Sequence, residues 1–76
     1  MSETEWLKIF AHNLREMLFD CNMSQRELAD ETGLSESTIS RYLSRQTVPS
    51  LFAIINIAYA LNCDINDLID FGDRIT

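Results

Sequence analysis

Polar side chains that could form hydrogen bonds together recur at helical spacing in the middle of the chain. They are Ser37, Ser40, Arg41 and Ser44. At about 100° per residue, these four share one face of a helix, opposite Ile39 and Leu43. Small hydroxyls let a helix lie deep in a groove, and the planar guanidinium of Arg41 suits the two acceptors that guanine presents in the major groove. This face therefore predicts readout of duplex DNA. For the serines, an ordinary solvated surface is the alternative interpretation.

Neighbouring residues extend this candidate site. Glu36 lies in the first turn of the same helix, where a carboxylate either accepts a hydrogen bond from cytosine or complements the charge of the helix start. Arg41 could contact DNA, or it could pair with Glu36 or Glu31 on the protein surface. Arg45 and Thr47 follow the helix, where basic side chains and backbone amides often bind phosphate.

The other reactive side chains do not form a recognisable site. His12 has no carboxylate or second histidine at ligand spacing, and Cys21 and Cys63 stand far apart at apolar positions. We expect both cysteines to be small core residues in a reducing compartment. Aspartates recur every three residues, at Asp64, Asp67, Asp70 and Asp73. The segment lacks the turn glycine of a calcium loop, so a helix cap and a solvated surface are expected there. We predict no catalytic residue, metal site, cofactor or small-molecule ligand.

The elements that position these residues are predicted to be helical throughout. A Ser-x-x-Glu pattern at Ser2 and again at Ser24 is typical of a helix start. Gly33 suits the left-handed residue that ends a helix, and Ser35 and Ser50 can cap the helices that follow them. The predicted helices span about residues 3–21, 25–32, 36–44, 51–62 and 65–71. Residues 1–76 are thus expected to form a single all-α domain.

The helix predicted over residues 51–62 is apolar on nearly all sides, which predicts that it is the central and most buried helix. A membrane span would need about 20 apolar residues, whereas Asn56 interrupts this shorter run. No signal peptide pattern is visible. We therefore expect a cytoplasmic protein without membrane contact, encoded by a bacterium or a phage.

Residues 24–44, SQRELADETGLSESTISRYLS, describe two short capped helices joined by a tight turn. Ala29 supplies a small residue where the two helices cross, and Gly33 supplies the turn. This segment resembles the helix-turn-helix of phage repressors, Cro proteins and XRE-type bacterial regulators, over about residues 7–71. The resemblance implies a compact five-helix, repressor-like domain that binds double-stranded DNA, with the helix over residues 36–44 in the major groove.

The resemblance also implies roles for particular residues. Gln25 begins the first helix of the motif, where the matching family residue bonds a phosphate and braces a base-reading side chain. Glu36 and Ser37 occupy the start of the second helix, where base contacts cluster in this family. The full candidate DNA-binding set is Gln25, Arg26, Ser35, Glu36, Ser37, Ser40, Arg41, Ser44, Arg45 and Thr47.

Charge opposes simple DNA binding, because the chain has six Lys and Arg against twelve Asp and Glu, a formal net charge of −6. DNA affinity rises with the number of phosphates neutralised, so we expect modest affinity per monomer and a homodimer on a palindromic operator. The alternative is a protein-binding module on the same scaffold with weak or no DNA binding. A positive strip along Arg26, Arg41 and Arg45 would favour the regulator, and an apolar or acidic surface over residues 36–44 would favour the alternative.

Two groups of apolar residues carry further expectations. Phe19, Phe71 and Ile75 are left over once the core is filled, so we expect them to contribute to a dimer surface near the last helix, as is common in the family. Relatives often place a buried Arg–Glu pair between the first and third helices, where this chain has Leu18 and Leu43. Because an apolar pair can replace such an ion pair, we predict that these two leucines touch.

Overall fold

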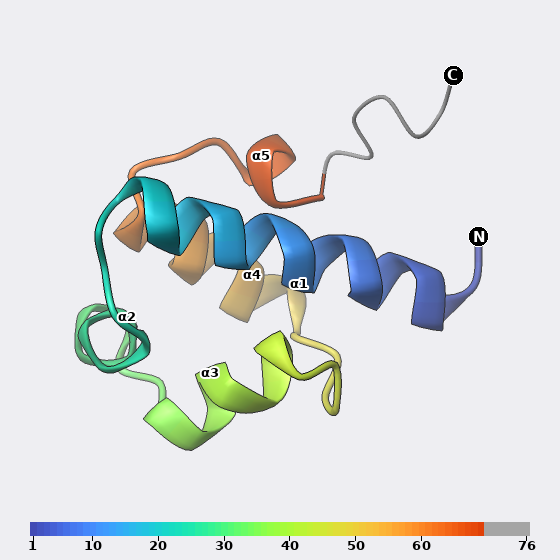
Figure 1. Cartoon of the computed structure of the whole chain (residues 1–76), viewed down its shortest axis with the longest axis horizontal. Helices are drawn as coiled ribbons and strands as arrows, with labels where there is room; N and C mark the ends of the chain where they lie inside the picture. The colour runs from blue at the N-terminus through green and yellow to red at the C-terminus, as the bar shows by residue number, and fades with distance from the viewer. Residues whose placement is uncertain (70–76) are drawn as a thin grey trace.

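The computed structural model describes residues 1–69 and consists of five α-helices joined by short turns (Figure 1). Their bounds are α1 Glu3–Asp20, α2 Gln25–Thr32, α3 Glu36–Leu43, α4 Leu51–Ala60 and α5 Ile65–Ile69. The predicted all-α, five-helix fold with a helix-turn-helix at its second and third helices is confirmed. The predicted last two residues of the fifth helix, 70 and 71, and the dimer candidates Phe71 and Ile75 lie outside the described residues.

Serine side chains start four of the five helices. The caps are Ser2, Ser24, Ser35 and Ser50, and each Oγ accepts a hydrogen bond from the backbone N–H three residues later. At α1 and α2 the bond is reciprocated, because the Glu5 and Glu27 carboxylates accept from the Ser2 and Ser24 backbone N–H at 3.1 and 3.0 Å. These backbone bonds, aided by the serine hydroxyls, lower the pKa of both glutamates. The two predicted capping patterns are therefore present in the fold.

A residue with a left-handed backbone follows each of the first four helices. Gly33 ends α2 with a φ of 78°, as its position in the sequence predicts. Asn22, Arg45 and Asn62 take the same conformation after α1, α3 and α4, with φ of 52°, 63° and 54°. Asparagine tolerates this region, whereas arginine has no preference for it. Arg45 is consequently the exceptional member of the group.

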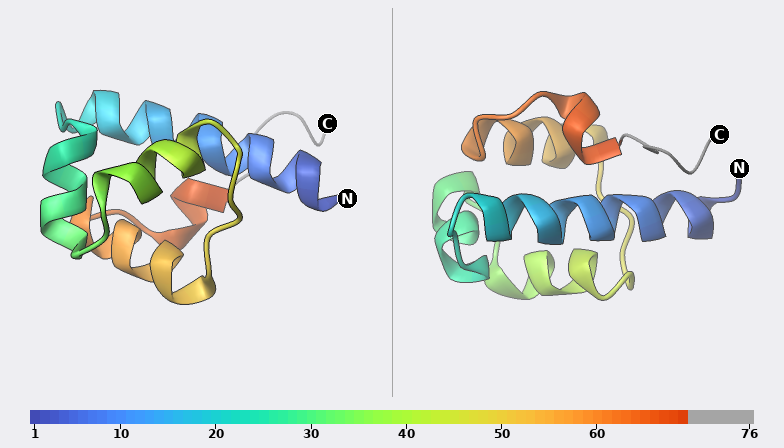
Figure 2. Two further views of the ribbon diagram at one scale, coloured as in Figure 1. Left: turned by 90° about the horizontal axis from the view of Figure 1, so that it is seen from below. Right: turned by 45° about the horizontal axis from the view of Figure 1, so that its top comes forward.

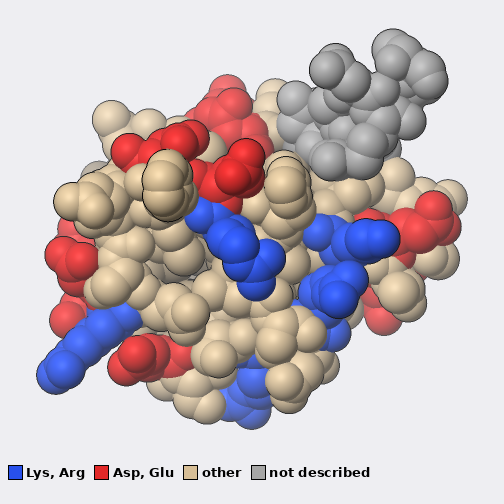
Figure 3. All heavy atoms as spheres, in the orientation of Figure 1, with Lys and Arg blue, Asp and Glu red and all other residues tan. Residues whose placement is uncertain are grey.

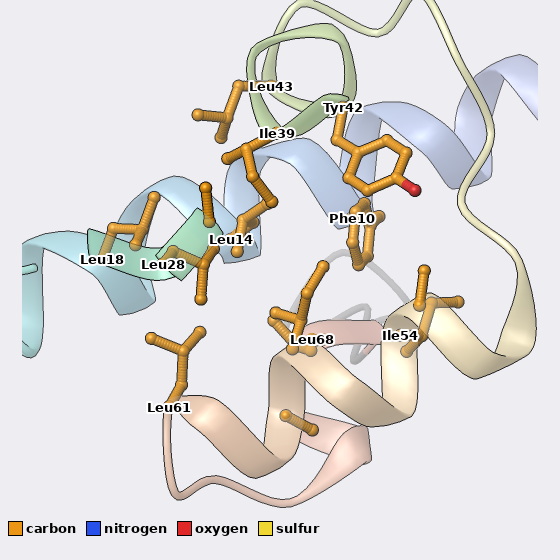
Figure 4. Packing of buried hydrophobic residues seen from close by; sticks show 14 of the residues in the cluster. Phe10, Leu14, Leu18, Leu28, Ile39, Tyr42, Leu43, Ile54, Leu61 and Leu68 are labelled. Carbon is orange, nitrogen blue, oxygen red and sulfur yellow. The ribbon is translucent and has the colours of Figure 1, made fainter. Parts of the chain in front are cut away.

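The core lies between α1 and the other four helices. α1 crosses the middle of the molecule, with α3 on one side and α4 and α5 together on the other (Figures 1 and 2). The largest fully buried side chains are Phe10, Leu14, Leu28, Ile39, Ile57 and Leu68, and Figure 4 shows most of them converging in one cluster. Phe10 also makes an edge contact with Tyr42 at a centroid distance of 6.2 Å, which joins α1 to α3. Leu18 and Leu43 are both buried in this cluster, and direct contact between them stays a prediction.

The structure corrects the prediction that the fourth helix is the central one, because α1 crosses the middle of the molecule and α4 buries only part of its apolar surface. α4 packs on α2 and α5 through one face only. Its other face is solvent-exposed and apolar, with exposed fractions of 68% for Leu51, 73% for Phe52, 50% for Ile55 and 87% for Tyr59. An apolar run does not indicate which of its faces a neighbour will cover. We call these four residues the α4 apolar face.

The prediction that both cysteines are core residues is wrong for Cys21. α1 ends at Asp20, so Cys21 is the residue that caps the helix and its side chain is exposed. Its Sγ lies 3.8 Å from the Leu61 carbonyl oxygen. Cys63 is half-buried against the core, and this burial raises the pKa of its thiol.

Candidate nucleic-acid interface

α3 is held to the protein by one face and presents the other to solvent. Ile39, Tyr42 and Leu43 are buried, with Ile39 fully inaccessible. On the partner helix, Leu28 and Ala29 are buried, so α2 and α3 form one packed unit. The opposite face of α3 carries Ser37, Ser40 and Arg41, and Ser44 caps the C-terminal end of the helix; all four predicted polar residues are exposed. We call these four residues the α3 ridge.

Arg41 lies along the ridge. Its Nη2 donates to the Ser37 Oγ at 3.3 Å, one turn earlier on α3. Within residues 1–69 it forms no ion pair with Glu36 or Glu31, which were the protein partners weighed from the sequence. The remaining guanidinium donors therefore face solvent, where they are available to a ligand.

The hydroxyls of Ser40 and Ser44 on the ridge, and of Ser35 beside it, differ in how far they are already hydrogen-bonded within the protein. Ser44 donates to the Ser40 carbonyl oxygen at 3.0 Å and accepts from the Gln46 side chain at 2.9 Å. Ser35 accepts from the Thr38 N–H at 3.0 Å as the cap of α3. Ser44 and Ser35 thus have structural roles, whereas the Ser40 hydroxyl has no such bond within the described residues.

The flanking candidates are all exposed as well. Gln25 and Arg26 form the first turn of α2, Glu36 the first turn of α3, and Arg45 and Thr47 the turn that follows α3. Figure 3 shows Lys and Arg side chains from the middle of this face to its lower edge, where α3 lies, and Asp and Glu mostly at the top and the sides. Within residues 1–69, none of the large exposed apolar side chains belongs to α2 or α3.

A basic groove beside α3 was not predicted from the sequence. It lies between α1 and the C-terminal end of α3, and its volume is about 510 Å³. The lining residues are Lys8, Ala11, His12, Arg15, Leu43, Ser44 and Arg45. Arg15 connects the two walls of the groove, because the Nη2 of this α1 residue donates to the carbonyl oxygen of Leu43 in α3 at 3.1 Å. The spacing of Lys8, His12 and Arg15 on one helix face was a usable signal, but the opposing wall is set by tertiary packing.

Comparison with known proteins places these features in a family. The sequence profile of the Cro/C1-type HTH DNA-binding domain matches residues 13–73. The restriction-modification controller protein C.AhdI from Aeromonas hydrophila is 32% identical, with a TM-score of 0.79, and the match covers 82% of this chain and 94% of that one. No curated protein matches the sequence.

Two further solved structures share the fold. A hypothetical transcription factor, NHTF from Neisseria, is 26% identical with a TM-score of 0.82, covering 91% of this chain and 79% of that one. The SOS-response transcriptional repressor LexA from Eubacterium rectale has a TM-score of 0.84 at 23% identity, covering 97% and 79%. At 23% identity, the similarity to LexA shows only that the two proteins share a fold. Within residues 1–69, no helix is long and apolar enough to cross a membrane.

Proposed function

The chain belongs to the family of Cro/C1-type helix-turn-helix DNA-binding domains, and from that premise we propose that it is a sequence-specific, non-enzymatic transcriptional regulator that inserts α3 into the major groove of duplex DNA. The family resemblance found in the sequence is confirmed. The observation that carries the proposal is the α3 ridge, which is polar, exposed and free of bulky apolar groups. Acting on DNA, the protein would work in the cytoplasm of a bacterium.

Arg41 is the residue we assign to base readout. It is exposed at the centre of the ridge, and its guanidinium can donate two parallel hydrogen bonds to a guanine. Arg26, in the first turn of α2, suits a backbone phosphate, together with Gln25. The two arginines therefore have different expected effects on binding, which an experiment can separate.

Selection of bound duplexes from a random pool, at low and at moderate salt, tests this function. We expect enrichment of a twofold symmetric site. Arg41→Ala should relax the preference at one base pair of each half-site by about 1–3 kcal/mol, whereas Arg26→Ala should weaken all duplexes alike. A pool in which no duplex is enriched at either salt would reject the regulator and favour the protein-binding module.

We further propose that the protein binds its operator as a homodimer and that two copies meet through the α4 apolar face. Its four side chains offer roughly 500 Å² of surface, since a large aromatic residue alone presents about 150–250 Å². Two copies would bury roughly 1,000 Å², which is the lower bound for a specific interface. None of the ten residues of α4 is charged, so two acidic copies can meet there without burying a charge.

The position of α4 suits this arrangement. Seen from the side of α3, α4 runs along an outer edge of the molecule (Figure 2, left). A twofold axis along that line of view would place both α3 helices on the same side of the dimer, as a palindromic operator requires. The sequence instead predicts a dimer surface near the last helix; two of its three residues, Phe71 and Ile75, lie outside the described residues, so that expectation stays a prediction.

Sedimentation at micromolar concentration tests the dimer with a matched pair of variants. Phe52→Glu places a charge in the α4 apolar face and should give a monomer, whereas Phe19→Glu makes the same change at an 82% exposed phenylalanine on α1 and should leave the dimer intact. Both side chains are exposed, so neither variant should unfold. A wild-type chain that sediments only as a monomer, with and without DNA, would reject the dimer. A dimeric Phe52→Glu variant together with a monomeric Phe19→Glu variant would reject the α4 surface.

A further inference from the structure

We propose that the basic groove between α1 and the end of α3 is a binding site for a phosphate group. The phosphate belongs either to the backbone of the bound duplex, in which case the inference rests on the proposed function, or to a free phosphate compound. The chemistry that recognises it is the same in both cases. Nothing in the helix-turn-helix itself requires this site, because Lys8, His12 and Arg15 all come from α1.

The first argument is charge. Three of the six Lys and Arg residues of the chain line this groove, together with its only histidine. No aspartate or glutamate among the described residues lines it, although the chain holds twelve of them. In a chain with a net charge of −6, this concentration creates a local positive potential that attracts anions.

The second argument is that most donors in the groove are unused. One N–H of the Arg15 guanidinium donates to the Leu43 carbonyl oxygen, and this bond orients the guanidinium across the groove. The side chains of Lys8, His12 and Arg45 donate to no other residue within residues 1–69. All four residues are exposed at the rim, so a tetrahedral anion with several acceptor oxygens can reach them.

Two carboxylates line hollows that share residues with the groove, but neither lines the groove itself. Glu5 lines a neighbouring hollow with Lys8 and His12, but its carboxylate already accepts from the Ser2 backbone N–H at 3.1 Å. Glu3 lines a different hollow, which Arg45 also lines. Neither forms an ion pair with the cations of the groove within the described residues. No carboxylate of the described residues therefore pairs with the cations that line the groove.

The third argument is the backbone at Arg45. Its φ of 63° lies in the left-handed region, where the equivalent positions after α1, α2 and α4 are asparagine or glycine. Arginine has no conformational advantage there, and a non-glycine residue held in this region can mark a functional site. The Arg45 side chain lines the groove, which places this residue at the proposed site.

The position of the groove suggests the duplex backbone as one source of the phosphate. Leu43, Ser44 and Arg45 form the wall that α3 contributes, so the groove begins where the α3 ridge ends. A duplex seated on the ridge would carry its sugar–phosphate strand past this end of α3.

The test measures the slope of log affinity against log salt for the selected duplex with two variants of equal net charge. Lys8→Gln removes a cation from the groove, and Asn66→Asp adds the same charge difference on α5, on the far side of α1 (Figure 1). Loss of one phosphate contact should reduce the steepness of the slope by about 0.9 in Lys8→Gln, with equal loss on all sequences and no change of base preference. Asn66→Asp should keep the wild-type slope.

A second arm uses inorganic phosphate without DNA, at constant ionic strength set by chloride, and follows the His12 ring signals by NMR. A changed salt slope in Lys8→Gln assigns the site to the duplex backbone. An unchanged slope with saturable phosphate shifts at His12 that Lys8→Gln abolishes assigns it to a free phosphate compound. An unchanged slope without such shifts overturns the inference, even if the wild-type chain binds DNA. If the wild type binds no duplex, the proposed function fails and the phosphate titration still decides the groove.

Discussion

Replacing Arg45 with glycine should make the folded chain more stable while weakening its binding of DNA. The backbone at this position has a φ of 63°. In that region the Cβ of an ordinary residue crowds the following carbonyl, at a cost of about 1–2 kcal/mol. Glycine escapes the crowding but loses about 0.5–1 kcal/mol more conformational entropy on folding. The balance predicts an increase of about 0.5–1 kcal/mol in the free energy of unfolding.

Thermal unfolding followed by circular dichroism would measure this gain as a rise of about 2–8 °C in melting temperature for a domain of this size. Arg45→Lys is the matched control, because it keeps both the strained backbone and the positive charge, and its melting temperature should equal that of the wild type. The same preparations should show reduced DNA affinity for glycine and near wild-type affinity for lysine. A glycine variant no more stable than the wild type would refute the reasoning from backbone strain.

Three further changes test the fold that positions the interface. Gly33→Ala places a Cβ at a φ of 78°, where no atom lies within 4 Å of it. Only the backbone should therefore oppose the change, and urea unfolding should show a free energy of unfolding lower by about 1 kcal/mol. An unchanged free energy of unfolding would contradict the role of this turn. Leu28→Ala empties a fully buried site and should lower the free energy of unfolding by about 2–5 kcal/mol in the same assay; a smaller loss would mean that the site collapses around the cavity. The pKa values of Glu5 and Glu27 are lowered by their bonds to Ser2 and Ser24, so their contribution to stability is complete above the ordinary value of 4.5 and is lost as the pH falls through the folded values. The urea midpoint should therefore fall on acidification, and Glu27→Gln should reduce that fall; a midpoint independent of pH below 4.5 would count against it.

The helix starts and the turn of the motif were predictable because their causes are local. When a serine and a glutamate stand three residues apart at a helix start, each side chain accepts a hydrogen bond from the backbone N–H of the other residue, whatever the rest of the chain does. Ser24 and Glu27 therefore indicate a helix start from the sequence alone. Gly33 follows the same logic, since only its own backbone decides whether it can take a positive φ.

The buried face of α4 could not be predicted, because its residues are apolar in every direction. Periodicity then carries no information, and the choice falls to the neighbouring helices. α4 packs on α2 and α5 with Ile54 and Ile57 buried, whereas Phe52 and Tyr59 remain exposed. The error on Cys21 is of a different kind, because a helix that ends one residue earlier turns an apolar-stripe position into an exposed cap.

The α3 ridge was predictable and the basic groove was not, for a related reason. Exposure of Ser37 and Arg41 follows from the burial of Ile39 on the same helix, so one helix suffices to infer it. The groove needs Arg15 of α1 beside Leu43 of α3, and residues 28 positions apart meet only through the packing of the core. The left-handed backbone after α3 was not predicted either, because the residue there is Arg45; its φ is 63°, and the following Gln46 N–H donates to the Arg41 carbonyl oxygen at 2.8 Å.

An acidic chain can bind a polyanion when its basic residues lie nearer to the polyanion than most of its carboxylates do. The molecule measures 36 × 23 × 19 Å, and at 0.1 M salt the screening length is about 10 Å. Carboxylates on the far side of α1 would therefore be largely screened from a duplex seated on α3, whereas Glu36, Arg41 and Arg45 would lie on the side of that duplex. Since few phosphates are neutralised, non-specific binding should be weak, and discrimination should come mainly from hydrogen bonds to base edges. Under the proposed function, the net charge of −6 weakens electrostatic binding to the operator and to random DNA alike, so the hydrogen bonds of the α3 ridge to base edges must distinguish the operator.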